Sequence, residues 1–203
     1  MNPSNLNPNF NSAIDYLNRG KIVIYPTETL YGMGVDAQNP KAVEHLFQIK
    51  KRALNKPLPI LLPSKKDLSH YCEEISPVAQ ALIQAFWPGP LTLILKCDKF
   101  PKGVSHNGTV GFKVSGHPLV QNLLLKYKRP ITTTSANISD KESPEDPMDF
   151  FRIFPKDSFV LIQEIKPSKP APPSTIVDCT GNDWKIVREG QITAEDIEEV
   201  LRG

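Results

Sequence analysis

Proline marks the start of three predicted helices and divides this chain into segments of alternating type. Asn39-Pro40, Ser76-Pro77 and His117-Pro118 each put proline at the first helical position, where its missing N–H costs no hydrogen bond. Short apolar stretches typical of buried strands lie before and after these helices. The alternation predicts an α/β fold, with a twisted mixed sheet flanked by helices and a ligand cavity at the strand ends. We expect one domain over residues 1–203, with its core from about residue 10.

Hydrophobic periodicity, capping residues and turn residues predict the elements in more detail. Helices are predicted at 10–18, from Pro40 to the basic pair Lys50 and Arg52, at 77–86, at 118–127, and after Thr193, where Asp196 completes a capping-box variant. Strands are predicted at 21–25, 57–62, 91–96, 109–114, 130–134, 158–163, 174–179 and 184–189. Gly32 and Gly34 are predicted to form a turn after the first strand.

Composition excludes several classes of protein. Apolar residues make up 39% of the chain and charged residues 23%, as in ordinary globular proteins. The formal net charge of +2 creates no overall field that would require nucleic acid as a partner. The N-terminus has no apolar signal segment and no stretch reaches the length of a membrane span, so we expect a cytoplasmic protein. The three cysteines are widely spaced, which favours reduced thiols over a disulfide or a metal site.

Polar residues follow two predicted strands directly. The first strand is followed by Thr27, Glu28, Thr29 and Tyr31. Hydroxyls and carboxylates at the end of a buried strand need hydrogen-bond partners, which makes them natural members of a binding site. The segment 132–137 has a similar character, although its threonines also suit a strand by β propensity, and Ser135 and Asn137 suit an ordinary turn.

Lys50 and Arg52 are the second indication of a ligand site. Cations at a helix C-terminus complement the helix dipole, and on these two residues alone that interpretation and a binding role are equally open. The segment Lys56-Pro57 and a buried strand follow, which directs the cations towards the sheet. Arginine offers a bidentate fork and lysine a point charge, a combination that suits polyphosphate or carboxylate. Together these features predict an enzyme that handles a phosphate-bearing small molecule.

Other patterns carry less chemistry. The histidines are scattered without metal-ligand spacing, and neither a Ser/His/Asp or Cys/His arrangement nor a Walker-type loop is apparent. The segment Phe86–Thr92 is interpreted as structural, because its aromatic rings bury area and its Pro-Gly-Pro run fixes a sharp reversal between helix and strand.

Eight short motifs, in order along almost the whole chain, resemble the YrdC-like family of L-threonylcarbamoyladenylate synthases. They are Tyr25-Pro26-Thr27-Glu28-Thr29, Tyr31-Gly32-x-Gly34, Lys50-x-Arg52, Lys56-Pro57-Leu58, Trp87-Pro88-Gly89-Pro90-Leu91-Thr92, Ser135-Ala136-Asn137, Ser174-Thr175-x-Val177-Asp178 and Arg188-x-Gly190-x-Ile192. The resemblance implies a mixed sheet with a large, positively charged cavity. Because the chain ends at Gly203, we expect the short, single-domain form of the synthase.

The resemblance also implies a reaction. L-Threonine, bicarbonate and ATP give threonylcarbamoyl-adenylate and pyrophosphate: the threonine amine captures CO2 as a carbamate, whose oxygen attacks the α-phosphorus of ATP. Catalysis of this kind is mostly positioning and electrostatic stabilisation, with Mg2+ accompanying ATP. The implied partners are downstream proteins that transfer the threonylcarbamoyl group to adenosine in tRNA, and tRNA itself.

Site residues are carried over by the same resemblance. ATP-binding contacts fall on Lys50, Arg52, Ser135, Asn137, Ser143 and Arg188, of which Lys50 and Arg52 are also the catalytic pair. Threonine-binding contacts fall on Thr27, Thr133, Ser174 and Lys113. Tyr31 either lines the cavity or packs in the core, and both interpretations stay open.

Three departures from the family pattern leave alternatives open. Lys113 stands where the family commonly has arginine, which keeps the charge and loses the bidentate geometry. The proline-rich segment 166–173 replaces a glycine-rich stretch, and Glu189 replaces a common proline. The alternatives are a non-catalytic module that binds tRNA or double-stranded RNA, and a paralogue with a different carbamoyl or adenylate substrate. The small net charge disfavours the first, and Lys113 favours the second.

Overall fold

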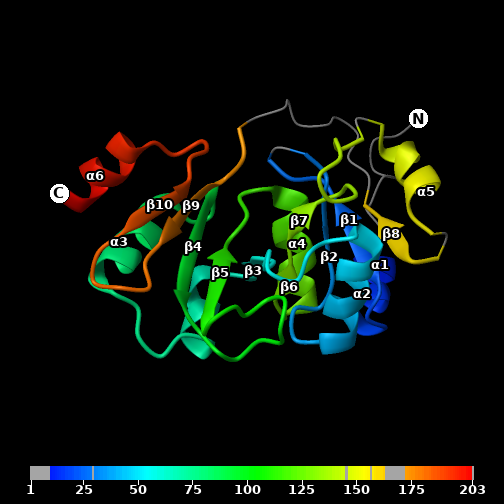
Figure 1. Ribbon diagram of the computed structural model, residues 1–203, viewed down its shortest axis with the longest axis horizontal. Helices are drawn as coiled ribbons and strands as arrows, with labels where there is room; N and C mark the ends of the chain where they lie inside the picture. Colours follow the sequence, from blue (N-terminus) through cyan, green and yellow to red (C-terminus); the bar gives the residue numbers. More distant parts are fainter. Residues whose placement is uncertain (1–9, 29, 145, 156, 163–171, 203) are drawn as a thin grey trace.

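Two β-sheets lie side by side and form the centre of the molecule (Figure 1). The computed structural model describes residues 10–28, 30–144, 146–155, 157–162 and 172–202. One sheet contains, in spatial order, β7 (Thr134–Ser135), β2 (Gly32–Gly34), β1 (Ile22–Tyr25) and β8 (Phe159–Leu161). The other contains β10 (Lys185–Arg188), β9 (Thr175–Asp178), β4 (Leu91–Lys96), β5 (Thr109–Lys113), β3 (Ile60–Leu61) and β6 (Ile131–Thr132).

Both sheets mix strand directions. The pairs β1–β8, β3–β5 and β4–β9 are parallel, and the other strand pairs are antiparallel. The predicted fold class, an α/β fold of mixed strands flanked by helices, is therefore confirmed. The division of the strands into two sheets was not predicted, because pairing between distant segments leaves no local signal in the sequence.

The helices flank the sheets, and the proline-marked starts are confirmed. The helical segments are α1 (Phe10–Asn18), α2 (Pro40–Lys50), α3 (Pro77–Phe86), α4 (Pro118–Tyr127), α5 (Phe150–Ile153) and α6 (Ala194–Arg202), with the 3₁₀ helices η2 (Lys65–His70) and η3 (Pro147–Asp149). The Asn39 side chain caps α2 by accepting hydrogen bonds from the N–H groups of Lys41 and Ala42. Thr193 and Asp196 exchange side-chain-to-backbone hydrogen bonds at the start of α6, as the capping-box variant predicts. The short segments η2, η3 and α5 were not predicted, because a helix of only one or two turns is too short to show a hydrophobic periodicity.

The predicted turn at Gly32 and Gly34 is wrong, because these residues form β2. This strand pairs with β1, so that Gly32 lies opposite Tyr25. A Cβ atom at Gly34 would lie 1.9 Å from the carbonyl oxygen of Thr132, a distance that no side chain can tolerate. The glycine is there to let two backbone segments approach closely and not to turn the chain.

The predicted strand 130–134 is also divided, and the division joins the two sheets. Ile131 and Thr132 pair with β3 in the larger sheet, whereas Thr134 and Ser135 pair with β2 in the smaller one. Between them the Thr133 N–H donates to the Pro59 carbonyl oxygen over 2.8 Å. The chain therefore crosses from one sheet to the other at Thr133, and the strand ends of both sheets meet there.

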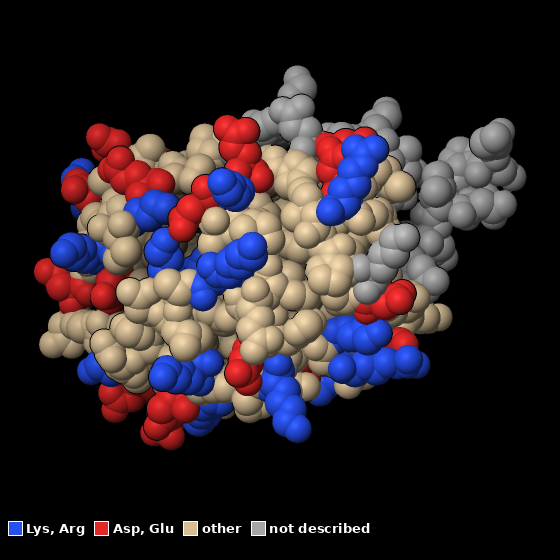
Figure 2. Space-filling view, turned by 45° about the vertical axis from the view of Figure 1, so that its right-hand side comes forward, with Lys and Arg blue, Asp and Glu red and all other residues tan. Residues whose placement is uncertain are grey.

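Charged residues of both signs are spread over the surface. On the face shown in Figure 2, Lys and Arg side chains alternate with Asp and Glu around a largely uncharged centre, and no continuous basic patch covers this face. Within the described residues, every helix is too short or too polar to cross a lipid bilayer.

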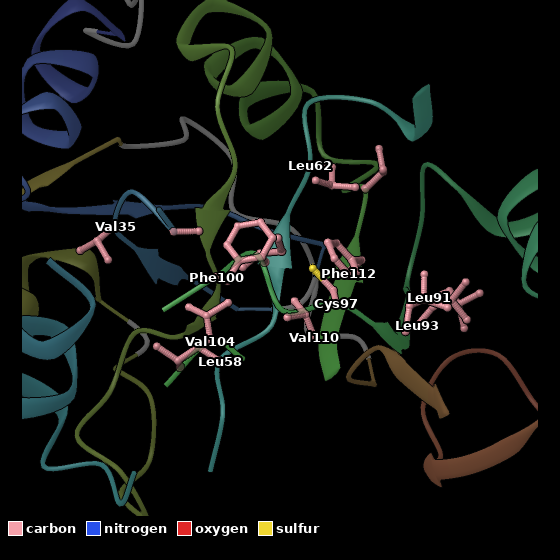
Figure 3. Packing of buried hydrophobic residues seen from close by; sticks show 14 of the residues in the cluster. Val35, Leu58, Leu62, Leu91, Leu93, Cys97, Phe100, Val104, Val110 and Phe112 are labelled. Atoms are coloured by element: carbon pink, nitrogen blue, oxygen red, sulfur yellow. The ribbon is translucent and has the colours of Figure 1, made fainter. Parts of the chain in front are cut away.

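Buried apolar residues form two clusters. In the smaller cluster, α1 and α4 pack against β1, with Leu17, Val23 and Leu124 fully buried. The larger cluster contains residues of both sheets, among them Ile24 of β1 and Phe112 of β5. Figure 3 shows Phe112 beside Cys97, and its ring also packs edge-on against Phe100, with ring centroids 6.1 Å apart. Because these clusters pack the strands closely, the residues at the strand ends have well-defined positions.

Candidate functional site

A cavity of about 420 Å3 lies where the two sheets meet. Residues of six strands contribute to it: β2, β4, β5, β7, β9 and β10. The loop between β1 and β2, the loop between α2 and β3, and the residues just before β9 complete its wall. The residues that line it are Thr27, Leu30, Tyr31, Gly32, Arg52, Pro57, Pro59, Thr92, Lys113, Thr133, Thr134, Ser135, Pro173, Ser174, Ile176 and Arg188. Among these described residues every charged one is a cation, so the cavity suits an anionic ligand.

Two other hollows are larger and carry less chemistry. One, of about 560 Å3, has a lining that mixes Glu73, Glu74 and Asp98 with two lysines. The other, of about 610 Å3, lies between η2 and α3 and is lined mainly by apolar and amide side chains. Neither gathers charges of one sign with hydroxyls, as the cavity between the sheets does.

Lys113 and Ser174 form one end of the cavity. The Lys113 ammonium donates to the Ser174 hydroxyl over 2.9 Å and to the Glu28 carboxylate over 3.4 Å. Burial lowers the pKa of Lys113 from its usual value, and Glu28 opposes that shift. The Arg188 guanidinium donates to the Ser174 carbonyl oxygen at 2.7 and 3.3 Å, so one cation holds the Ser174 side chain and another holds its backbone.

Arg52 reaches the cavity from the loop after α2. Its guanidinium donates to the carbonyl oxygens of Lys56 over 2.7 Å and of Pro57 over 3.2 Å. These two bonds fix the direction of the half-buried guanidinium. Burial lowers its pKa, while the nearby Asp140 opposes the shift. Arg52 therefore remains a cation and faces the cavity with its direction set by the backbone.

Lys50 lies behind the cavity wall, and only 1% of it is exposed. Its ammonium donates over 2.7 Å to the carbonyl oxygens of Ser135 and Asn137, and over 3.2 Å to the Asn137 side-chain oxygen. The Ser135 hydroxyl donates to the same Asn137 oxygen over 2.7 Å. Burial, together with the charge of Arg52, lowers the pKa of Lys50 to about 7. Lys50 thus holds the loop from Ser135 to Asn137 in shape.

The structure brings most of the predicted site residues to one cavity. The predicted residues that line it are Thr27, Arg52, Lys113, Thr133, Ser135, Ser174 and Arg188. Lys50, Asn137 and Ser143 are not part of this lining. Lys50 and Asn137 contact Ser135 from behind, and Ser143 lies half-buried in the loop before η3. The predicted roles of all these residues in binding and catalysis stay predictions.

Two other sequence interpretations can be placed. Tyr31 both lines the cavity and packs edge-on against Phe150, with ring centroids 5.5 Å apart, so its two interpretations are compatible. Trp87 is buried and its indole N–H donates to the Leu91 carbonyl oxygen over 2.8 Å, in agreement with a structural role. Of the proline-rich segment 166–173, residues 166–171 lie outside the described residues, and so does Thr29.

Glu28 was expected near a binding site from its place after the first strand, but its pairing with Lys113 and the contribution of Ser115 were not predicted. The Glu28 carboxylate accepts from the Ser115 hydroxyl over 2.8 Å and from the Gly116 N–H over 2.7 Å, in addition to Lys113. The available signal was a carboxylate at the end of a buried strand, with a lysine at the end of another. The described residues contain no group of three His, Cys, Asp or Glu side chains that could hold a metal ion.

Comparison with known sequences places this geometry in a family. A family model named Sua5_yciO_yrdC and described as telomere recombination matches residues 15–190. The chain is 37% identical over 180 residues to a putative threonylcarbamoyl-AMP synthase of Methanocaldococcus jannaschii, which covers 88% of this chain and 84% of that protein. It is 34% identical to the threonylcarbamoyl-AMP synthase of Pyrococcus abyssi over 93% of this chain, and spans only 56% of that longer protein.

Solved structures agree with the sequence relatives. P. abyssi Sua5 complexed with L-threonine matches with a TM-score of 0.83 at 30% identity, over 95% of this chain and 57% of that chain. YciO of E. coli matches with a TM-score of 0.77 at 23% identity, over 93% of this chain and 92% of that chain, which shows a shared fold. The chain belongs to the Sua5/YciO/YrdC family.

Proposed function

We propose that this chain is a threonylcarbamoyl-AMP synthase that joins L-threonine, bicarbonate or CO2, and ATP. Family membership and the names of several relatives support this proposal. The observation that carries it is the cavity between the sheets, which places Arg52, Lys113 and Arg188 around a group of hydroxyls. A cavity of this charge suits a ligand that bears both phosphates and a carboxylate.

The proposed reaction needs positioning more than proton transfer. The threonine amine adds to CO2 and releases a proton, and one oxygen of the resulting carbamate attacks the α-phosphorus of ATP. The bond from that phosphorus to the bridging oxygen of pyrophosphate breaks, and the electron pair leaves with pyrophosphate. Because negative charge builds on phosphate oxygens, the cations of the cavity stabilise the transition state without a dedicated general base.

The residues divide between the two substrates. Arg52, Ser135 and Arg188 face the phosphates, and Lys50 and Asn137 support Ser135 from behind the wall. Ser143 is a further ATP contact in this proposal. Thr27, Thr133, Ser174 and Lys113 face L-threonine, and Arg188, which contacts Ser174, lies where the two substrates meet. Mg2+ enters as the MgATP substrate, held by the phosphates, since no carboxylate is found among the described residues that line the cavity.

The proposed product has a defined destination. Threonylcarbamoyl-AMP would pass to proteins that transfer the threonylcarbamoyl group to adenosine in tRNA, so the site of action is the cytoplasm.

Pyrophosphate release from MgATP tests the proposal. We expect release that depends on both L-threonine and bicarbonate, with threonylcarbamoyl-AMP detected by mass spectrometry. Release with another amino acid in place of threonine would identify the paralogue with an altered substrate. ATP binding without any release would rule out the synthase activity. Binding of structured RNA that weakens steeply with salt, in the absence of ATP binding, would favour the RNA-binding module.

A further inference from the structure

Glu28 is held in place by groups that the proposed chemistry does not use. Its Oε1 atom accepts two hydrogen bonds, from the Ser115 hydroxyl over 2.8 Å and from the Gly116 N–H over 2.7 Å. Its Oε2 atom faces the Lys113 ammonium at 3.4 Å. Contacts to both oxygens restrict the rotation of the carboxylate. Glu28 is therefore a rigid anion directed at Lys113.

Lys113 projects from the end of β5 into the cavity, and only 9% of it is exposed. An ammonium has three N–H donors. In the described part of the chain two of them are used, one by Glu28 and one by the Ser174 hydroxyl. The third donor is available to a ligand in the cavity, and its direction is determined by the other two.

The charge of Lys113 depends on Glu28. Burial lowers the pKa of Lys113, and the nearby Arg188 guanidinium lowers it further. Glu28 opposes both through its charge and its hydrogen bond. Glu28 itself keeps its charge, because Lys113, Ser115 and Gly116 together outweigh its burial and lower its pKa. Without Glu28, a lysine between burial and Arg188 would lose its proton more easily.

We propose that Glu28 is a positioning residue for substrate binding: it keeps Lys113 charged and aims its third donor at the carboxylate of the amino-acid substrate. This inference rests on the proposed function, and it identifies what makes Lys113 able to bind a carboxylate as a point charge. The loop of Glu28 and the loop of Ser115 and Gly116 act together, since both are tied to the same carboxylate.

The variant Glu28→Gln tests the proposal because it keeps the shape and removes the charge. We expect the KM for L-threonine to rise by about tenfold to a hundredfold, the loss of one charge-assisted hydrogen bond. The KM for MgATP should change by less than about twofold, because Glu28 does not act on the phosphates. The alkaline limb of kcat/KM for threonine should move to lower pH, because Lys113 loses its proton earlier. Glu28→Asp should restore part of the affinity.

Two further variants separate positioning from folding. Lys113→Met should raise the KM for threonine, and adding Glu28→Gln to it should have little further effect, because both changes remove one interaction. Glu199→Gln is the matched control, because it makes the same change from carboxylate to amide at an exposed position of α6, away from the cavity. Should Glu28→Gln fail to fold, Ser115→Ala removes one donor to the carboxylate and should shift the threonine KM in the same direction by a smaller factor.

Equal increases in the KM for threonine and for MgATP, or an unchanged alkaline limb in Glu28→Gln, would overturn the proposal. The pKa of the Lys113 side chain, measured by NMR in the wild type and in Glu28→Gln, gives a readout that needs no activity. A lower pKa in the variant supports the positioning role even if the wild type releases no pyrophosphate with threonine. That second result would contradict the proposed function, so the two failures are distinguishable.

Discussion

Lys50 and Lys113 are two buried lysines beside the same cavity, and their surroundings differ. Lys50 donates to three uncharged oxygens, two of them backbone carbonyls. Lys113 donates to a hydroxyl and to the carboxylate of Glu28. Lys50 therefore has no carboxylate partner, whereas Lys113 is paired with one. Each lysine also has an arginine nearby, Arg52 for Lys50 and Arg188 for Lys113.

The difference matches the two proposed substrates. ATP carries several negative charges, and Arg52, whose own hydrogen bonds go to backbone carbonyl oxygens, suits its phosphates. An amino acid is zwitterionic, so a lysine already paired with a carboxylate binds it without attracting polyphosphate to the same place. The two lysines beside one cavity thus differ in whether their charge is paired with a carboxylate.

Replacing Lys50 should have the largest effect on both activity and stability. Lys50→Met removes the Lys50 donor from the Asn137 carbonyl oxygen and one of the two donors from the Ser135 carbonyl oxygen, which should cost about 1–3 kcal/mol in the free energy of unfolding. Turnover should fall by about two orders of magnitude, because the Ser135–Asn137 loop loses its shape. Urea denaturation and pyrophosphate release measure these quantities. Lys41→Met, at an exposed position of the same helix, is the control. Full turnover in a folded Lys50→Met variant would contradict this role.

Replacing Arg52 should affect activity and leave stability nearly unchanged. Arg52→Ala should lower turnover by about a hundredfold, as the loss of a pre-organised donor does. The free energy of unfolding should change by less than about 1 kcal/mol, because the guanidinium is half-buried and its carbonyl partners can reach water. Arg52→Lys should recover only a small part of the activity, since lysine lacks the bidentate fork. If both variants turned over at the wild-type rate, Arg52 would not be a phosphate contact.

The pH dependence of stability distinguishes the two lysines. The pKa of Lys50 is lowered from 10.5 to about 7, so between these values the unfolded chain binds more protons than the native protein. Stability from this group should therefore rise as the pH increases above 7, by at most about 1.4 kcal/mol per pH unit. Urea denaturation at about pH 7 and about pH 9 should show this rise in the wild type and not in Lys50→Met. If stability changed with pH equally in the wild type and in Lys50→Met, the three oxygens would keep Lys50 protonated against the effect of burial.

Glu28 should contribute the smallest effect, at acidic pH. Its pKa is lowered below 4.5, so its contribution to stability is present above that value and is lost as the pH falls through the lower, native pKa. Thermal melts at descending pH should show Glu28→Gln losing less stability than the wild type in that range. A wild type and a variant with parallel acid profiles would mean that Glu28 does not interact with Lys113 as the structure shows.

Local patterns in the sequence predicted most of the individual elements. The helices at 10–18, 77–86 and 118–127 have the predicted bounds, because hydrophobic spacing and proline at the first position are properties of neighbouring residues. The motif resemblance also selected seven of the residues that line the cavity. It could not show that Lys50 lies behind the wall while Arg52 lies in front, since that depends on how the loop after α2 is held.

The sequence by itself determined the fold class, the helix starts and the residue types of the site, because these follow from local spacing and composition. Only the tertiary structure decided that Gly32 to Gly34 form a strand, that the chain changes sheets at Thr133, and that Glu28 meets Lys113. Each of these depends on contacts between segments far apart along the chain. Their energies come from packing and hydrogen bonds that form only when both sheets are assembled.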